Sequence, residues 1–100
     1  IQSVIIEPRL VEYIAKIVIE TRNNSALYLG ASPRASLAIL RASKASAAIK
    51  GRDFVTPEDI IEMAAPVLRH RIILAPEKEM EGISPDDLIE SILKGIEVPR

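Results

Sequence analysis

The sequence contains no cysteine, and this absence excludes several kinds of chemistry at once. Disulfide bonds, zinc sites built from thiolates and cysteine nucleophiles are all ruled out. A chain without cysteine fits a reducing compartment, so we expect a cytoplasmic protein. No apolar run approaches the roughly 20 residues that a membrane-spanning helix requires. The opening residues, IQSVIIEPR, also lack the basic start and long apolar stretch of a signal peptide.

Histidine and aromatic residues are scarce as well. His70 is the only histidine, so a multi-histidine metal site or a Ser-His-Asp triad has little to draw on. A net charge of -1 and 3% aromatic residues argue against a general nucleic-acid binder. The glycine-rich loop G-x-x-x-x-G-K-[ST], which holds phosphate groups in many ATPases, is absent. One hundred residues suit one small domain, and a chain that begins with isoleucine is expected to be a piece of a longer protein.

Apolar spacing and capping residues predict an all-α fold, a small bundle of four to five helices. At most a short extended segment is expected, at 26–29, and residues 74–83 are predicted to be a connecting loop. Acidic pairs follow the starts of the third and the last helix, where capping and the helix dipole favour them. The predicted helices cover 8–23, 33–50, 56–72 with a kink or break at Pro66, and the residues from 84 onward. The second is predicted to stop at Gly51, a residue type that commonly ends helices. The first carries an apolar stripe of Leu10, Val11, Ile14, Ile17 and Val18.

The second predicted helix has an unusual start. Ser32 is a good N-cap and Pro33 a good first residue, which places Arg34 in the first turn. A cation there opposes the helix dipole, at a cost of roughly a few tenths of a kcal/mol, so an anion nearby would explain the arginine. Arg41 and Lys44 extend a basic stripe along the same helix. This stripe is either a solvated face or a surface that binds an anion.

One long stretch, LYLGASPRASLAILRASKASAAIKGRDFVTPEDIIEMAAPVLRHRIIL, closely resembles the C-terminal lid of MoxR-family AAA+ ATPases. The similarity extends over EGISPDDLIESIL and covers nearly the whole chain after Glu7. GASPRAS is highly specific, and GRDFVTPEDI followed by APVLRHRI argues against chance agreement. The departures are mild: Ser43 and Ser46 stand where alanines are usual, and Phe54 where tyrosine is common. The resemblance implies a linker from the ATPase core at 1–7, the helical lid at 8–96 and a tail at 97–100.

The resemblance also implies a role for the arginine at the start of the second helix. In AAA+ proteins a lid arginine called sensor 2 contacts the terminal phosphate of ATP within its own subunit, and Arg34 matches that position. Arg34 and Ser32 are therefore expected to bind the nucleotide, and Arg34 to couple ATP binding and hydrolysis to lid movement in a chaperone-like remodelling ATPase. By the same resemblance, the full-length parent uses ATP and magnesium and forms a hexameric ring. Its expected partners are its own ATPase core and proteins with von Willebrand factor A domains.

The chain by itself is expected neither to hydrolyse ATP nor to bind it tightly. The phosphate loop, the magnesium-coordinating acids and the water-positioning residues of such an ATPase are missing from it. Two other kinds of function stay open at this point. One is a small helical binding module that uses its basic helix on nucleic acid or on an acidic protein; the other is a purely structural bundle that mediates subunit contacts.

Overall fold

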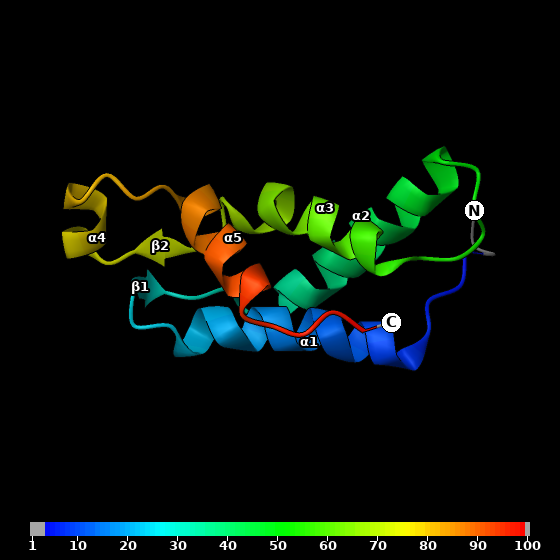
Figure 1. The fold of residues 1–100 in the computed structure, drawn as a ribbon, viewed down its shortest axis with the longest axis horizontal. Coiled ribbons are helices and arrows are strands. Elements are labelled where there is room, and N and C mark those ends of the chain that lie inside the picture. The colour runs from blue at the N-terminus through cyan, green and yellow to red at the C-terminus, as the bar shows by residue number, and fades with distance from the viewer. Residues whose placement is uncertain (1–3, 100) are drawn as a thin grey trace.

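Three helices, α1 (Pro8–Asn23), α2 (Arg34–Ile49) and α3 (Pro57–Leu68), form the body of the molecule, and α2 contacts both of the others. The computed structural model describes residues 4–99, in a body of 44 × 21 × 21 Å. A two-stranded antiparallel sheet and a one-turn helix lie at one end of this body, and α5 packs across α1 and α3 (Figure 1). No described helix is long and apolar enough to span a membrane. In chain order the described elements are α1 (Pro8–Asn23), β1 (Leu27–Leu29), α2 (Arg34–Ile49), α3 (Pro57–Leu68), β2 (Ile73–Leu74), α4 (Pro76–Met80) and α5 (Pro85–Lys94).

Local capping signals set most of the helix ends. Thr56 and Ser84 each accept a hydrogen bond from the backbone N–H three residues on, from Asp59 and Asp87 respectively. Both aspartates return a bond to the N-cap backbone, so both sites are complete capping boxes, and the predicted capping role of the acidic pairs is confirmed. After α2, Gly51 adopts a positive φ of 80°, the left-handed conformation in which helices commonly end.

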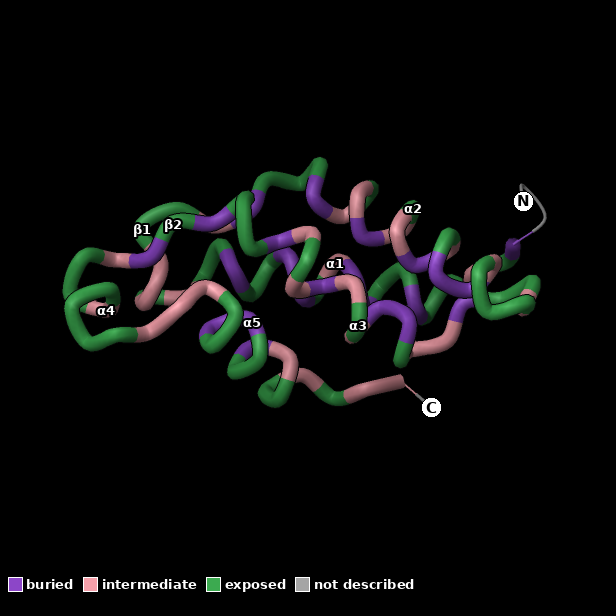
Figure 2. Tube along the Cα trace, turned by 90° about the horizontal axis from the view of Figure 1, so that it is seen from above, coloured by how far each residue is buried: buried purple, intermediate pink, exposed green. Residues whose placement is uncertain are grey.

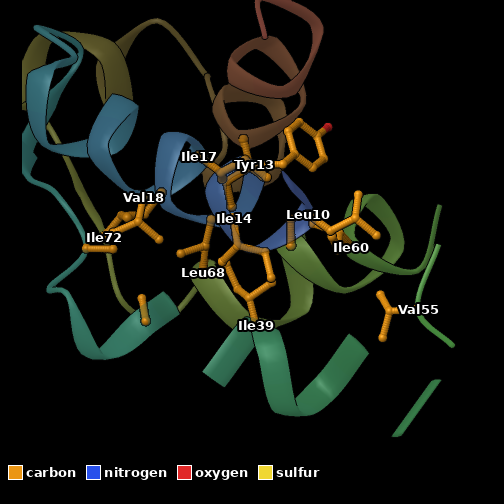
Figure 3. Close-up of a cluster of buried hydrophobic side chains, with 14 of the residues drawn as sticks. Leu10, Tyr13, Ile14, Ile17, Val18, Ile39, Val55, Ile60, Leu68 and Ile72 are labelled. Carbon is orange, nitrogen blue, oxygen red and sulfur yellow. The ribbon is translucent and has the colours of Figure 1, made fainter. Parts of the chain in front are cut away.

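The core lies where the apolar faces of the three long helices meet. Figure 3 shows α1 side chains such as Ile14 and Ile17 packed towards Ile39 of α2 and Leu68 of α3. The predicted apolar stripe of α1 is confirmed with one correction: Val11 is 44% exposed, and Tyr13 is buried in the core. A smaller apolar cluster lies beside the two-stranded sheet. Its buried members are Leu74, Leu88 and Ile92.

Two sequence predictions about the later helices are wrong. Pro66 does not break α3, which continues through it and ends two residues later at Leu68, well before Ile72. Proline has no N–H to donate to the helix. Because α3 ends two residues after Pro66, the hydrogen bond that is lost belongs to the last turn of the helix. The predicted loop 74–83 contains the five-residue helix α4, which begins at a proline and has acids in its first turn. One turn is too short to produce a 3.6-residue apolar period, so periodicity could not reveal it.

The first described residues are anchored to the loop between α2 and α3. The Ile5 N–H donates to the Asp53 carbonyl at 2.8 Å, and the Val55 N–H donates to the Ile5 carbonyl at 2.9 Å. Val4 is buried next to them. Figure 2 shows that both ends of the described chain lie at the same end of the body, away from the two-stranded sheet.

Candidate functional site

The loop that leads into α2 is fixed to the last turn of α1. The Thr21 hydroxyl donates to the Val18 carbonyl at 2.6 Å and accepts from the Ala31 N–H at 3.0 Å, and Thr21 is only 1% exposed. A Cβ on Gly30 would lie 2.5 Å from the Thr21 carbonyl oxygen, so the loop backbone approaches α1 more closely than any side chain would allow. These contacts determine where α2 begins in relation to α1.

The start of α2 differs from the sequence prediction. Pro33 occupies the N-cap position and Arg34 is the first helical residue, and no side chain caps the helix. The prediction of a Ser32 side-chain cap is therefore wrong: the first turn is closed by the backbone, with the Ala35 N–H donating to the Ser32 carbonyl at 2.9 Å. Ser32 and Arg34 are both exposed. The Ser32 hydroxyl is thus not used for capping and remains available to a ligand.

A pocket of about 410 Å³ opens beside this helix start. The loop forms its floor, and two basic side chains come from elsewhere in the chain: Arg22 from the last turn of α1 and Arg71 from the turn between α3 and β2. No aspartate or glutamate is among the lining residues. These are Arg22, Leu29, Gly30, Ala31, Ser32, Pro33 and Arg71. The charged groups of the pocket are all cations, which suits an anion.

Arg34 follows the pocket residue Pro33 directly, and its charge is not balanced by the described chain. Within residues 4–99 no carboxylate forms an ion pair with it, and the same holds for Arg41 and Lys44 farther along α2. The choice that the sequence left open for this basic stripe, a solvated face or an anion-binding surface, stays a prediction. Arg34 itself is not among the residues that line the pocket.

The other cationic residues around α2 have a structural role at its far end. Asp59, fully buried at the start of α3, accepts two hydrogen bonds from the Arg52 guanidinium, at 2.7 and 2.8 Å. Lys50 and Ser46 also donate to its Oδ1, at 3.4 and 3.3 Å, and the Thr56 N–H donates to its Oδ2. The Arg52 hydrogen bonds are the main reason that the pKa of Asp59 lies far below its usual value, against the opposing effect of burial. The GRDFVTPEDI stretch is thereby explained as a joint between α2 and α3.

Metal chemistry has no support within the described residues. No group of three or more His, Asp or Glu side chains among them could hold a metal ion. The pocket supplies guanidinium groups and one free hydroxyl, a donor set that fits phosphate oxygens and does not fit a cation. Of the two residues that the sequence predicts for nucleotide binding, Ser32 lines the pocket and Arg34 does not, and sequence reasoning missed Arg22 and Arg71. The segment between Glu20 and Asp53 contains basic residues and no acidic ones, and this was the only sequence signal for Arg22. No pattern in the neighbouring residues indicates a binding role for Arg71.

Comparison with known proteins agrees with this geometry. A family model described as the AAA lid domain matches residues 19–92. YeaC of Bacillus subtilis is 38% identical over 99 residues, which cover 99% of this chain and 31% of that protein. The chaperone MoxR1 of Mycobacterium tuberculosis is 38% identical over 100 residues, covering 91% of this chain and 26% of that protein. The crystal structure of a protein described as a putative ATPase from Cytophaga hutchinsonii superposes with a TM-score of 0.91 and 40% identity, over 99% of this chain and 33% of that one.

The family model and the superposed structure thus identify a helical lid, the class of domain that accompanies an ATPase core. The chain belongs to the AAA lid domain family, and its predicted resemblance to the lids of MoxR proteins is confirmed. It spans between a quarter and a third of the length of these relatives.

Proposed function

We propose that this lid serves a MoxR-type AAA+ ATPase and that Arg34 is its sensor 2 residue, which contacts the terminal phosphate of ATP held by the ATPase core. One observation carries the proposal. Arg34 is exposed in the first turn of α2, directly after the pocket residue Pro33, and no carboxylate forms an ion pair with it within residues 4–99. An arginine that the dipole of its own helix disfavours becomes favourable when a phosphate supplies the negative charge.

The described residues can contribute charge and position but no bond-breaking group. Magnesium-bound ATP supplies the phosphoryl group and its electrophilic phosphorus when it is bound to the core. Arg34 would donate hydrogen bonds to phosphate oxygens and offset their charge, and the free Ser32 hydroxyl would donate one more. Because the Arg34 contact is lost with the terminal phosphate, the position of the lid would depend on the nucleotide state.

The wider setting is also part of the proposal. MoxR1 is named as a chaperone, and we propose a chaperone-like remodelling role for the parent of this chain. We further propose a cytoplasmic, hexameric ring in which this lid packs against its own ATPase core, with von Willebrand factor A domain proteins among its partners.

ATP turnover by the full-length protein tests the role of Arg34. Arg34→Ala is expected to slow turnover by about ten- to a thousand-fold, the range seen when one donor to a transition-state oxygen is removed. Lys44→Ala is the matched control, since Lys44 is another unpaired cation of α2 that lies ten residues farther along the helix. Normal turnover by an Arg34→Ala protein with an unchanged melting temperature would overturn the proposal.

A second candidate function rests on the remainder of the basic stripe. Arg41 and Lys44 also have no carboxylate partner among the described residues, so they could bind an acidic protein or nucleic acid. This alternative predicts binding of DNA at low salt that weakens steeply as salt rises. Arg41→Ala and Lys44→Ala should weaken it further. No binding at low ionic strength would exclude the nucleic-acid form of this alternative.

A further inference from the structure

Two arginines that are far apart in the sequence line the same pocket. Arg22 lies in the last turn of α1, and Arg71 lies in the turn between α3 and β2. Arg71 meets the segment after β1 because β1 and β2 pair in antiparallel fashion, and Arg22 meets the same segment because Gly30 packs against the backbone of Thr21 and Arg22. Figure 1 shows the end of α1, the segment from β1 to α2 and the segment from α3 to β2 converging there.

The charge of this pair is not compensated within the described chain. Three other arginines each have a carboxylate partner: Arg9 with Glu7, Arg52 with Asp59 and Arg69 with Asp86. Arg22 has no such partner within residues 4–99. Arg71 donates only to the Val67 carbonyl, at 3.3 Å.

The helix dipole explains part of this arrangement. A cation near the C-terminus of α1 and another near that of α3 are each favourable, which accounts for either arginine taken singly. The helix dipole does not explain why both guanidinium groups line one pocket without an acidic residue, since two positive charges placed close together repel each other. A third cation, Arg34, follows the pocket residue Pro33. Together these arginines form a cationic site, and no carboxylate of the described chain balances its charge.

We infer that Arg22 and Arg71 bind the phosphate chain of the nucleotide, as a second cationic contact beside Arg34. This inference rests on the proposed function. Guanidinium groups present two parallel N–H donors that match the spacing of phosphate oxygens, so two of them lining one pocket can both bind such a group. The pocket floor adds the free Ser32 hydroxyl, and the Thr21 contact with Ala31 fixes that floor in place. Arg22 and Arg71 therefore add affinity for phosphate, whereas Arg34 acts on turnover.

Equilibrium binding of a fluorescent ATP analogue to the full-length protein tests this inference. Arg22→Gln and Arg71→Gln are each expected to raise the Kd by about ten-fold, the usual effect of losing a charged hydrogen bond. The matched control is Arg69→Gln. Arg69 lies two residues from Arg71 but pairs with Asp86 at 2.9 Å and does not line the pocket. Arg71→Lys should recover part of the affinity, because it keeps the charge but loses the paired donors.

The outcomes separate this inference from the function on which it rests. Unchanged Kd values for Arg22→Gln and Arg71→Gln, with slow turnover by Arg34→Ala, would overturn the inference and leave the sensor 2 role standing. Weakened binding in the two glutamine variants, with normal turnover by Arg34→Ala, would support the pocket and overturn the sensor 2 role. If the glutamine variants bind nucleotide normally but change the oligomeric state on gel filtration, the arginines face an acidic protein surface and the inference is wrong.

Discussion

At the scale of single residues, Thr21 links α1 to the loop before α2. Its hydroxyl satisfies two backbone groups, one on α1 and one on the loop before α2, in a place that water does not reach. A buried N–H that loses its acceptor costs about 1–3 kcal/mol, which is a large share of the stability of a small domain. The position of the pocket floor therefore depends on one hydroxyl group.

Replacing Thr21 with valine tests this dependence. Thr21→Val keeps the shape of the side chain but leaves the Ala31 N–H without its acceptor, so we expect a loss of about 1–3 kcal/mol in the free energy of unfolding. Thr21→Ser, which keeps the hydroxyl, should lose about 1 kcal/mol or less. Urea unfolding measures both variants. Equal losses for the two would show that packing of the methyl group, and not the hydrogen bond, holds the loop.

At the scale of elements, α2 and α3 are joined at one end by the charged cluster around Asp59. The bidentate Arg52 contact, the Lys50 contact and the capping box all use the same carboxylate, so one side chain both starts α3 and fastens it to α2. Ser46, one of the departures from the family pattern, donates to this carboxylate from the last turn of α2. At the N-terminal end of α2, beside the pocket, the described residues form no comparable charged cluster with α3.

The Asp59 cluster predicts how stability depends on pH. Because the folded state lowers the pKa of Asp59, its ionised form stabilises the fold at all pH values above the unfolded pKa of about 3.9. That contribution is lost progressively as pH falls below this value towards the lower folded pKa. Asp59→Asn should therefore cost about 2–4 kcal/mol at pH 7, and the difference from the native protein should shrink between pH 5 and pH 2. Urea unfolding across this range is the measurement.

Glu62→Gln provides the control for this experiment. Glu62 also receives a hydrogen bond from Lys50, at 2.7 Å, but its side chain is 57% exposed, so its loss should matter far less. A pH dependence that is the same in Asp59→Asn as in the native protein would contradict the assignment of the acid sensitivity to Asp59.

The sequence predicted those features that depend on residues close together in the chain. The α1 stripe, the two capping boxes and the turn at Gly51 each depend on neighbouring residues, and all were predicted. The start of α2 was predicted to within one residue, but its Ser32 side-chain cap was wrong, because the first turn is closed by backbone hydrogen bonds. The convergence of Arg22 with Arg71 requires the pairing of β1 with β2, which no local pattern reveals.

At the scale of the whole molecule, the core has two parts of unequal size. The main cluster joins α1, α2 and α3, whereas the cluster beside the two-stranded sheet has three buried members, Leu74, Leu88 and Ile92. A small apolar cluster opens at lower free energy than the main core does. The end of the body that carries β1, β2 and α4 should therefore open without unfolding of the rest.

Hydrogen exchange tests this division. The Ala75 N–H, which donates to the Ala26 carbonyl at 2.9 Å next to the sheet, should exchange about 100-fold faster or more than the amides of Ile14 and Ile17 in α1. Mass spectrometry or NMR under native conditions would measure both sets. Equal protection at the two ends would show that the body unfolds as a single cooperative unit.

The close approach of Gly30 to Thr21 has a mechanical consequence. With only 2.5 Å between an added Cβ position and the Thr21 carbonyl oxygen, the loop and the last turn of α1 cannot slide past each other without a collision of backbone atoms. A displacement of the start of α2 should therefore displace the end of α1 as well. If the lid moves as proposed, the pocket floor, the start of α2 and the end of α1 should therefore move together, and any bending should occur outside this joint.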